Sequence, residues 1–423
     1  MTTSDGSSTL RPTVLGLAPS FGFGDRLGTA TPGHVEALRE HGGAIAPIFA
    51  QQSIREMTRT NRTAADVMGA AIDALEAEGY SDPWGADADH LKTRQDVDVT
   101  AEAGFVFFTI DPSQYVDAKA DDYEAGFADS PLSQKFEQIR DRTLWVKQYL
   151  DKTIEVPDGP SIVFDELTVR RAAVKYGGAI EHAIELCRYI DKVMTARGSA
   201  YELELSVDET PQPTTPAEHY IIADQCRAAG VKLVSLAPRY VGDFEKGIDY
   251  KGDLVVFERS LTEHAAIARH LGPYKLSLHS GSDKLSIYGV LAEVTGGLFH
   301  VKTAGTSYLE ALRVVVRHDI SRFRQIVESS REHFATDRAT YHISAELAKV
   351  PPPSAVPDPR KLEQIYLDEN DGRQILHVTF GSVLTDPTLG PAVKQVLTAH
   401  PQTHRQVLAA HFGKHLAALR SGM

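Results

Sequence analysis

Residues 276–284 read LSLHSGSDK, a stretch that starts as an apolar strand and ends in a turn crowded with polar groups. Successive side chains of a strand point to opposite faces, so Ser277 and His279 share one face while Leu276 and Leu278 share the other. This two-sided pattern is typical of a barrel strand, which packs one face on helices and turns the other toward the barrel axis.

The rest of the chain repeats this combination of a short apolar run, a polar turn and a helical pattern. The strand-like runs are 13–18, 44–50, 104–111, 200–209, 231–239, 274–280, 297–305 and 374–382. Between them, apolar residues fall at helical spacing, as in 63–79, 167–196, 216–230, 261–272 and 307–319. Alternating strands and helices predict a parallel sheet, and eight strands predict an α/β fold of the TIM-like (β/α)8 barrel type with long insertions.

An open doubly wound parallel sheet is the alternative fold. No strand-like run precedes a GxGxxG turn, and FGFGDRLG (21–28) places Arg26 and Leu27 where a pyrophosphate cradle needs small residues. We expect a mobile tail at 1–12, one elaborated barrel over 13–395 and a C-terminal helix over 396–423. The proline-rich segment 349–361 is expected to be an extended strap.

Composition limits the possible partners. The 423 residues carry a net charge of -13, which argues against nucleic acid or an anionic membrane as the main partner. Two isolated cysteines, Cys187 and Cys226, do not form a disulfide framework, and the start MTTSDGSSTLRP lacks the apolar core of a signal peptide. We expect a cytoplasmic protein that binds a small molecule and that can form a homo-oligomer.

Polar residues two apart recur on the predicted strands. The sets that share a face are Thr109 and Asp111; Glu202, Glu204, Ser206 and Asp208; Ser235 and Arg239; Ser277 and His279; His300 and Lys302; and His377 and Thr379. Any one of them can be a satisfied core residue, but burying so many charges without pairing or a metal is costly. Imidazole and carboxylate ligands predict zinc, manganese, nickel or cobalt. The predicted ligands are Glu204, His279 and His377, with His300 and Asp208 as alternates.

Other residues have an open role. Lys302 suits a proton-transfer group, a clamp for a carboxylate or a Schiff-base nucleophile. Arg26 and Arg239 lie in loops after strands and suit bidentate carboxylate binding, although Arg26 can instead pair with Asp25 or Asp89. The stretch WGADADHLK (84–92) reads as a loop before a strand, in which His90 either binds substrate or serves turn chemistry.

The C-terminal segment carries four histidines, His400, His404, His411 and His415. The last two are four residues apart on a predicted helix, a spacing that can bind a metal. Because this helix is expected to lie far from any strand end, we interpret its histidines as surface or packing residues.

Several long strings of this sequence resemble the tagaturonate epimerase family. They are SFGFGDRLGTATPGH (20–34), WGADADHLK (84–92), FFTIDPSQYVD (107–117), ELSVDET (204–210), LAPRYVGDFEKGIDYKGD (236–253), KLSLHSGSDKLSIYG (275–289), FHVKTAGTSYLEALR (299–313), TYHISAE (340–346) and HVTFGSVL (377–384). The resemblance covers roughly residues 15–385. It implies a divalent-metal-dependent isomerase that interconverts tagaturonate and fructuronate in hexuronate breakdown, or the neutral pair tagatose and fructose.

The implied reaction constrains the mechanism, because the inverted carbon is β to the ketone and simple enolisation cannot reach it. Retro-aldol cleavage followed by re-addition can invert it, as can transient oxidation by a nicotinamide, for which the sequence has no dinucleotide motif. The proton-transfer candidates are Asp208, Glu209, Asp283 and Lys302. The substrate-binding candidates are Arg26, Arg239, Lys284, Ser280, Ser282, Asp111 and His90. A metal-dependent aldolase or isomerase of a related sugar acid, and a catalytically idle sugar-acid binding protein, remain alternatives.

Overall fold

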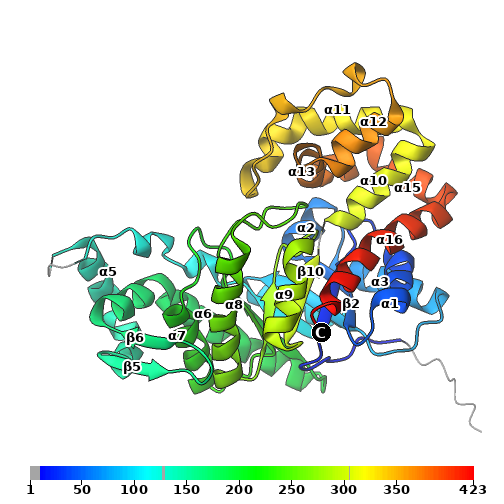
Figure 1. The fold of residues 1–423 in the computed structure, drawn as a ribbon. Helices are drawn as coiled ribbons and strands as arrows, with labels where there is room; N and C mark the ends of the chain where they lie inside the picture. Colours follow the sequence, from blue (N-terminus) through cyan, green and yellow to red (C-terminus); the bar gives the residue numbers. More distant parts are fainter. Residues whose placement is uncertain (1–9, 126–128, 304) are drawn as a thin grey trace, which may run out of the picture.

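The computed structural model describes residues 10–125, 129–303 and 305–423, in which eight parallel strands close into a barrel (Figure 1). The expected tail at 1–12 lies mostly outside the described residues. The barrel strands are β1 (Ser20–Gly24), β2 (Ala46–Ser53), β3 (Gly85–Leu91), β4 (Phe107–Ile110), β7 (Glu202–Ser206), β8 (Ser235–Ala237), β9 (Lys275–Leu278) and β10 (Phe299–Thr303). Each strand pairs with the next one along the chain, and β10 pairs with β1. The predicted TIM-like barrel is therefore confirmed.

Helices surround this barrel and continue beyond it at the C-terminal end (Figure 1). They are α1 (Thr31–His41), α2 (Ile54–Arg59), α3 (Ala64–Ala77), α4 (Arg94–Glu102), α5 (Pro131–Ile139), α6 (Glu166–Ala196), α7 (Pro216–Ala228), α8 (Leu254–Leu271), α9 (Leu285–Thr295), α10 (Thr306–His318), α11 (Ile320–Asp337), α12 (Pro359–Glu363), α13 (Asn370–Val378), α14 (Phe380–Thr385), α15 (Leu389–Ala399) and α16 (Pro401–Arg420). Capping boxes at Thr63, Thr93 and Thr215 fix the starts of α3, α4 and α7.

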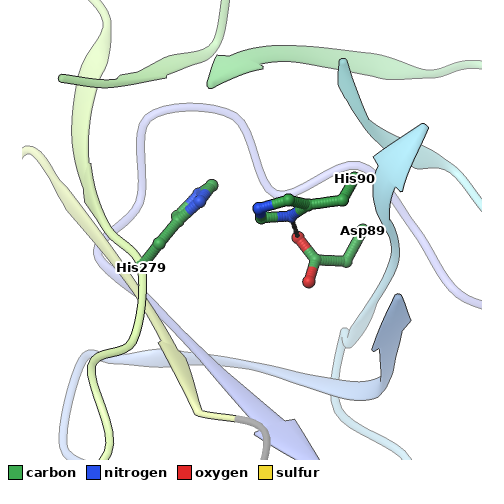
Figure 2. A group of neighbouring side chains, drawn as sticks. All are labelled: Asp89, His90 and His279. Carbon is green, nitrogen blue, oxygen red and sulfur yellow. Dashed lines mark hydrogen bonds and ion pairs between the residues drawn. The ribbon is translucent and has the colours of Figure 1, made fainter. Parts of the chain in front are cut away.

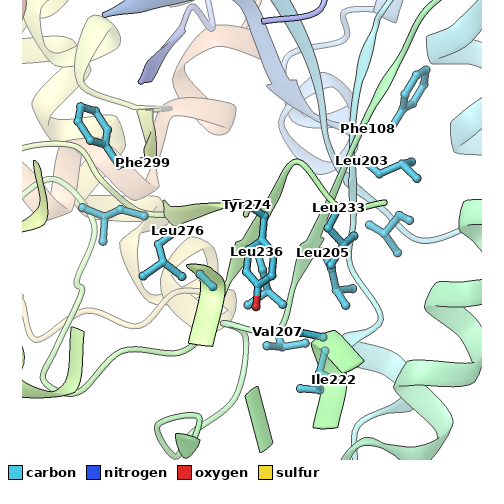
Figure 3. Packing of buried hydrophobic residues seen from close by; sticks show 14 of the residues in the cluster. Phe108, Leu203, Leu205, Val207, Ile222, Leu233, Leu236, Tyr274, Leu276 and Phe299 are labelled. Carbon is cyan, nitrogen blue, oxygen red and sulfur yellow. The ribbon is translucent and has the colours of Figure 1, made fainter. Parts of the chain in front are cut away.

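Side-chain alternation on β7 separates the core from the barrel axis. Leu203 and Leu205 pack among the apolar residues between strands and helices (Figure 3). Glu204 lies on the opposite face and is paired in register with Thr109 of β4 and Ser235 of β8. Because register partners in parallel strands share a face, these polar residues form one layer across the barrel interior.

Strand β1 starts later than expected. The run 13–18 is not a strand, and residues 20–24, read above as a glycine-rich turn, form β1 instead. Phe21 and Phe23 bury on the helix side, whereas Gly22 faces the axis beside Lys302. A Cβ at Gly22 would lie 2.6 Å from the end of the Gln51 side chain, which would have to shift to admit a larger residue there. The glycines obscure an otherwise regular alternation.

Strand β3 occupies residues that were predicted as a loop. Ala86 and Ala88 face the helices, while Asp87 and Asp89 face the axis. Two alanines are a weak strand signal because strand propensity comes mainly from branched and aromatic side chains. His90 follows in a left-handed conformation, with φ 58°, where the regular strand is disturbed.

The predicted strand at 374–382 is wrong, because these residues belong to helices α13 and α14. Ile375, Leu376 and Val378 are buried in a second hydrophobic cluster, separate from the main core. The hydroxyl of Thr379 donates to the carbonyl of Ile375 at 2.8 Å, as in a helix. His377 and Thr379 therefore do not share a strand face.

Three insertions elaborate the barrel. Between β4 and α6 lie α5 and the antiparallel hairpin of β5 (Lys152–Glu155) and β6 (Ser161–Phe164). A long loop joins β8 to α8. Helices α11 to α15, here called the helical cap, build the second hydrophobic cluster together with α10. The cap stands over one end of the barrel, and α16 returns to lie beside α1 (Figure 1).

The segment 349–361 is not one extended strap, since it contains short 3-10 turns and the first residues of α12. No helix in the described part of the chain has both the length and the apolar content needed to cross a membrane.

Candidate active site

A cavity of about 490 Å³ opens at the carboxyl ends of the barrel strands and is bounded on one side by the helical cap. Its lining residues include Arg26, Arg55, Glu56, Asp89, His90, Asp208, Glu209, Arg239, Lys246, His279, Ser280, Ser282, Lys302, Tyr341 and His377. In barrels of this type the strand ends carry the chemistry, so the cavity is the candidate active site.

Lys302, on β10, forms ion pairs with carboxylates of β3 and β7 at the floor of this cavity. Its ammonium lies 2.8 Å from both Asp87 and Glu204 and 2.9 Å from Asp89, and it also donates to the Thr109 hydroxyl. Burial opposes its charge, but Asp87, Asp89 and Glu204 overcome this effect and raise the pKa of Lys302. The amine is therefore a protonated structural cation and is unsuited to Schiff-base chemistry.

Two imidazoles face each other in this cavity, one from the end of β3 and one from the end of β9 (Figure 2). The ring centroids of His90 and His279 are 5.1 Å apart. One ligand atom from each, together with one carboxylate oxygen of Asp89, lie within 4.8 Å of one another. We call these three residues the His-Asp cluster.

Hydrogen bonds orient both rings. His90 Nδ1 lies 2.8 Å from Asp89 Oδ1, and His279 Nε2 lies 2.8 Å from Glu204 Oε1. If each of these nitrogens donates its proton, His90 Nε2 and His279 Nδ1 keep their lone pairs. A carboxylate that accepts from one ring nitrogen while the other nitrogen binds a cation is the usual arrangement of metal-binding histidines.

Negative charge exceeds positive charge around the cluster. Asp87, Asp89 and Glu204 surround Lys302, and Asp208 lies beside His279. These four carboxylates and one ammonium leave three negative charges if both imidazoles are neutral. A divalent cation would cancel two of them, and so would protons on the two rings. The donor set of imidazoles and carboxylates thus fits a divalent metal such as zinc, manganese, cobalt or nickel.

The pKa values of the two histidines reflect the same excess of negative charge. Burial favours the neutral ring in both cases. Asp89 nevertheless raises the pKa of His90 to about 9, and Asp208 and Glu204 raise the pKa of His279 to about 10. Burial would raise the pKa of Asp208, but His279 lowers it. The cluster therefore attracts positive charge strongly.

Asp208 and Glu209 follow β7 and occupy different settings. Asp208 accepts from the Ser206 hydroxyl at 2.5 Å and lies 3.5 Å from His279 Nδ1. Glu209 is about one-third exposed, and its nearest charged atoms are on His90 at 3.7 Å and Arg55 at 3.8 Å. No hydrogen bond to Glu209 is present among the described residues, so its carboxylate is accessible to a substrate.

The predicted metal ligands do not converge as one set. Glu204 touches His279, but its carboxylate is already shared by Lys302, Ser235 and Thr109. His300 lies beside Ser20, with Nε2 3.9 Å from Asp87. His377 reaches the cavity from the cap and lies outside every group of candidate ligands found in the described residues.

The two arginines proposed for a carboxylate differ in availability. Arg26 is buried, pairs with Glu56 through two nitrogens at 2.6 and 2.8 Å, and stacks on the Phe380 ring. Its partner is therefore neither Asp25 nor Asp89. Arg239 lines the cavity, donates to the Tyr240 carbonyl and lies 5.7 Å from the Phe244 ring.

The polar turn after β9 faces the cavity with some of its residues and the β8–α8 loop with others. Ser280 and Ser282 line the cavity. Lys284 is buried outside the lining, and its ammonium donates to the carbonyls of Glu245, Ile248 and Ser282. Burial lowers its pKa to about 7. Lys284 thus fastens the β8–α8 loop to this turn.

Asp283 also points away from the cavity. It pairs with Arg373 of the cap at 2.6 Å and lies 3.3 and 3.4 Å from His411 and His415. The expectation that these histidines lie far from any strand end is therefore wrong, because α16 packs against the turn that follows β9. Asp111, at the end of β4, pairs with Lys92 at 3.2 Å and is not among the lining residues.

Sequence reasoning missed several residues that line the cavity or contact Lys302 at its floor. Asp87 and Asp89 were missed because β3 was not recognised as a strand, although their spacing of two residues places both on the same face of a strand. Arg55 and Glu56 begin α2 after β2, and Lys246 lies in the β8–α8 loop. Nothing in the local pattern distinguishes Lys246 from an ordinary surface lysine.

Fold and site together define an enzyme of the (β/α)8 barrel class, with a carboxylate–imidazole–lysine centre beneath a polar cavity. The family model for tagaturonate epimerase (UxaE) matches residues 7–419. The chain belongs to the tagaturonate epimerase family, a family of isomerases.

Relatives of known name agree with this assignment. The chain is 45% identical over 410 residues to a tagaturonate/fructuronate epimerase of Thermotoga maritima, covering 97% of this chain and 82% of the relative. Crystal structures of the fructuronate-tagaturonate epimerase from Cohnella laeviribosi are also similar. The complex with one glycerol matches with a TM-score of 0.90 and 38% identity, and the native form with a TM-score of 0.89 and 38% identity. Each covers 97% of this chain, which spans 83% of the crystallised one.

Proposed function

We propose that this protein interconverts tagaturonate and fructuronate and that it uses a divalent cation held by the His-Asp cluster. Family membership and the 45% identical relative support the substrate pair. The observation that supports a metal is the pair of facing imidazoles. Hydrogen bonds to Asp89 and Glu204 orient the two rings. His90 and His279 would supply the principal ligands, with Asp89 or Asp208 beside them.

A bound divalent cation would supply Lewis-acid stabilisation of negative charge on the substrate's ketone oxygen. The protein's own groups must move one proton. We assign this role to Glu209, because its carboxylate lines the cavity, is accessible and makes no competing hydrogen bond among the described residues. Lys302 is committed to Asp87, Asp89 and Glu204, and Asp283 lies outside the lining, so neither suits proton transfer.

The proposed reaction is a retro-aldol cleavage followed by an aldol addition. Glu209 takes the proton of the hydroxyl on the carbon β to the ketone, and a C=O bond forms there as the bond to the α carbon breaks. The electron pair of that bond passes into an enediolate. After the aldehyde turns over, the same carbon–carbon bond re-forms on its other face, and Glu209 returns the proton to the new alkoxide. No electrons are gained or lost overall.

Conversion of fructuronate by the purified protein tests the proposal, with tagaturonate identified by NMR. We expect a chelator to abolish conversion and zinc, manganese, cobalt or nickel to restore it. His90→Ala and His279→Ala should lose bound metal in elemental analysis, whereas His318→Ala, on the exposed end of α10, should retain it.

Each part of the proposal can fail separately. Full activity in metal-depleted protein would reject the metal. Absence of epimerisation with every one of these metals would reject the epimerase. Accumulation of three-carbon fragments in place of the epimer would establish an aldolase instead.

A further inference from the structure

Lys246 is a cation of the cavity without a carboxylate partner in the described part of the chain. It lies in the β8–α8 loop and lines the cavity, and its ammonium is 2.5 Å from the Ser280 hydroxyl. Among the described residues no carboxylate oxygen comes within ion-pair distance of it, since Asp208, Glu56 and Glu209 act only at longer range. An ammonium has three N–H donors, so two remain for a ligand.

Three other cations of the cavity lie beside carboxylates. Arg26 pairs with Glu56, Arg55 lies beside Glu209, and Lys302 is shared by three carboxylates. Arg239 has no carboxylate partner in the described chain either, but its guanidinium is held by a backbone carbonyl of its own loop. Lys246 is therefore the cation of the cavity that is best placed to pair with the anionic group of a ligand.

His377 of the cap adds a second unsatisfied group to the same wall. Its side chain is buried, its ring lines the cavity, and its Nδ1 has no hydrogen-bond partner among the described residues. Burial, with Arg26, Lys246 and Arg373 nearby, holds its pKa well below the usual value. A neutral imidazole in a positive environment can still donate one N–H to an anion.

Two glycines leave space for this ring. A Cβ on Gly305 would lie 1.9 Å from His377 Nε2, and a Cβ on Gly247 would lie 3.0 Å from its Cδ2. Gly247 directly follows Lys246 and has a φ of 71°. The close approach of Gly247 to His377 thus places Lys246 and His377 on the same wall of the cavity.

Ser280 connects this place to the His-Asp cluster. It directly follows His279 and has a left-handed φ of 51°, which is uncommon outside glycine. The hydroxyl that holds Lys246 therefore stands one residue from a ligand of the proposed cation. A six-carbon sugar acid has its carboxylate several bonds from its ketone, as such a two-part site requires.

We propose that Lys246, with Ser280 and His377, binds the substrate carboxylate and so selects hexuronates over neutral ketohexoses. This inference rests on the proposed function. In a retro-aldol reaction the carboxylate belongs to the aldehyde fragment, the half that must turn over. Its anchor would keep that fragment in the cavity while the reacting carbon rotates.

Lys246→Met tests the carboxylate site, because methionine keeps the length of the side chain and removes its charge. Affinities for fructuronate and for fructose are measured by competition, together with kcat and KM for fructuronate. We expect fructuronate to bind at least about 30-fold more weakly, as for loss of one partner of a buried charge pair, and fructose affinity to change less than about threefold. Lys246→Arg should retain most of the preference.

Lys251→Met is the matched control. Lys251 lies in the same loop, outside the cavity lining, where it pairs with Glu245 and Ser344. A general loop distortion would weaken both sugars alike in either variant. Equal losses for both sugars in Lys246→Met, or no loss for either, would overturn the carboxylate site. Failure of the wild-type protein to interconvert the hexuronates would instead overturn the proposed function.

Discussion

Lys302 shows what a single residue does at the centre of this barrel. Three carboxylates, two from β3 and one from β7, surround one ammonium that is almost fully buried. Without the cation, those carboxylates would repel one another at the largely buried floor of the cavity. Lys302 therefore determines whether the polar interior of the barrel is stable.

Replacing Lys302 by Met should lower the free energy of unfolding by about 3–5 kcal/mol, the usual cost of removing one partner of a buried ion pair. Urea unfolding followed by circular dichroism measures this loss. A loss below about 1 kcal/mol would show that the carboxylates are neutralised by something other than the lysine.

At the scale of elements, the cavity depends on how closely the cap approaches the strand ends. Gly305, at the start of α10, faces the imidazole that α13 contributes. The approach leaves no room for a methyl group. The position of α13 over the barrel therefore requires residue 305 to be a glycine, which has a hydrogen atom where other residues have a Cβ.

Gly305→Ala should therefore push His377 and α13 away, at a cost of about 1–3 kcal/mol in unfolding free energy, as for other overpacked sites. It should also raise KM for fructuronate. Gly69→Ala in α3 is the control, because its added Cβ meets no atom of the described residues within 4 Å, and alanine should stabilise that helix by up to about 1 kcal/mol. Equal behaviour of the two variants would contradict the close approach.

The elements also show how far sequence alone could go. Strands β7 and β9 were predicted because leucines alternate with polar residues along them. Strands β1 and β3 were missed because glycine and alanine stand where branched residues usually mark a strand. Helix α13 was mistaken for a strand, since its apolar run is buried in the cap, and packing there outweighs local propensity.

The site was harder to predict than the fold. Side-chain alternation along β9 predicted that His279 points toward the barrel axis. The proximity of His90 and His279, however, depends on closure of the barrel, which brings the ends of β3 and β9 together. His377 approaches from a separate cluster of helices, and no pattern within its own segment reveals that. Sequence therefore predicted the kind of residues in the site better than their partners.

At the scale of the whole molecule, buried neutral histidines make stability depend on pH. Burial lowers the pKa of His34 to about 3 and the pKa values of His264 and His415 to about 4. The unfolded chain takes up protons at these positions below about pH 6.5, whereas the folded chain does not. Their stabilising effect is thus present above pH 6.5 and is lost as the pH falls toward 4.

We therefore expect the urea midpoint to fall between pH 7 and pH 5, with each of the three histidines costing on the order of 2 kcal/mol at pH 5. The raised pKa values of His90 and His279 act in the opposite direction, but they change the free energy less over this interval. Measurement at constant ionic strength checks the sign. A midpoint that stays constant or rises would show that these rings are protonated in the folded protein.

The pairing of β1 with β10 has a consequence for the way the protein is made. A growing chain that has reached β9 already carries Asp87, Asp89 and Glu204 but lacks Lys302, and its sheet still has two open edges. Open edges are prone to pair with other chains. The same short segment, Phe299–Thr303, seals the sheet and delivers the ammonium. We expect the nascent barrel to remain dependent on chaperones until this segment leaves the ribosome, and its closure to precede the docking of the helical cap and α16, which follow it in the chain.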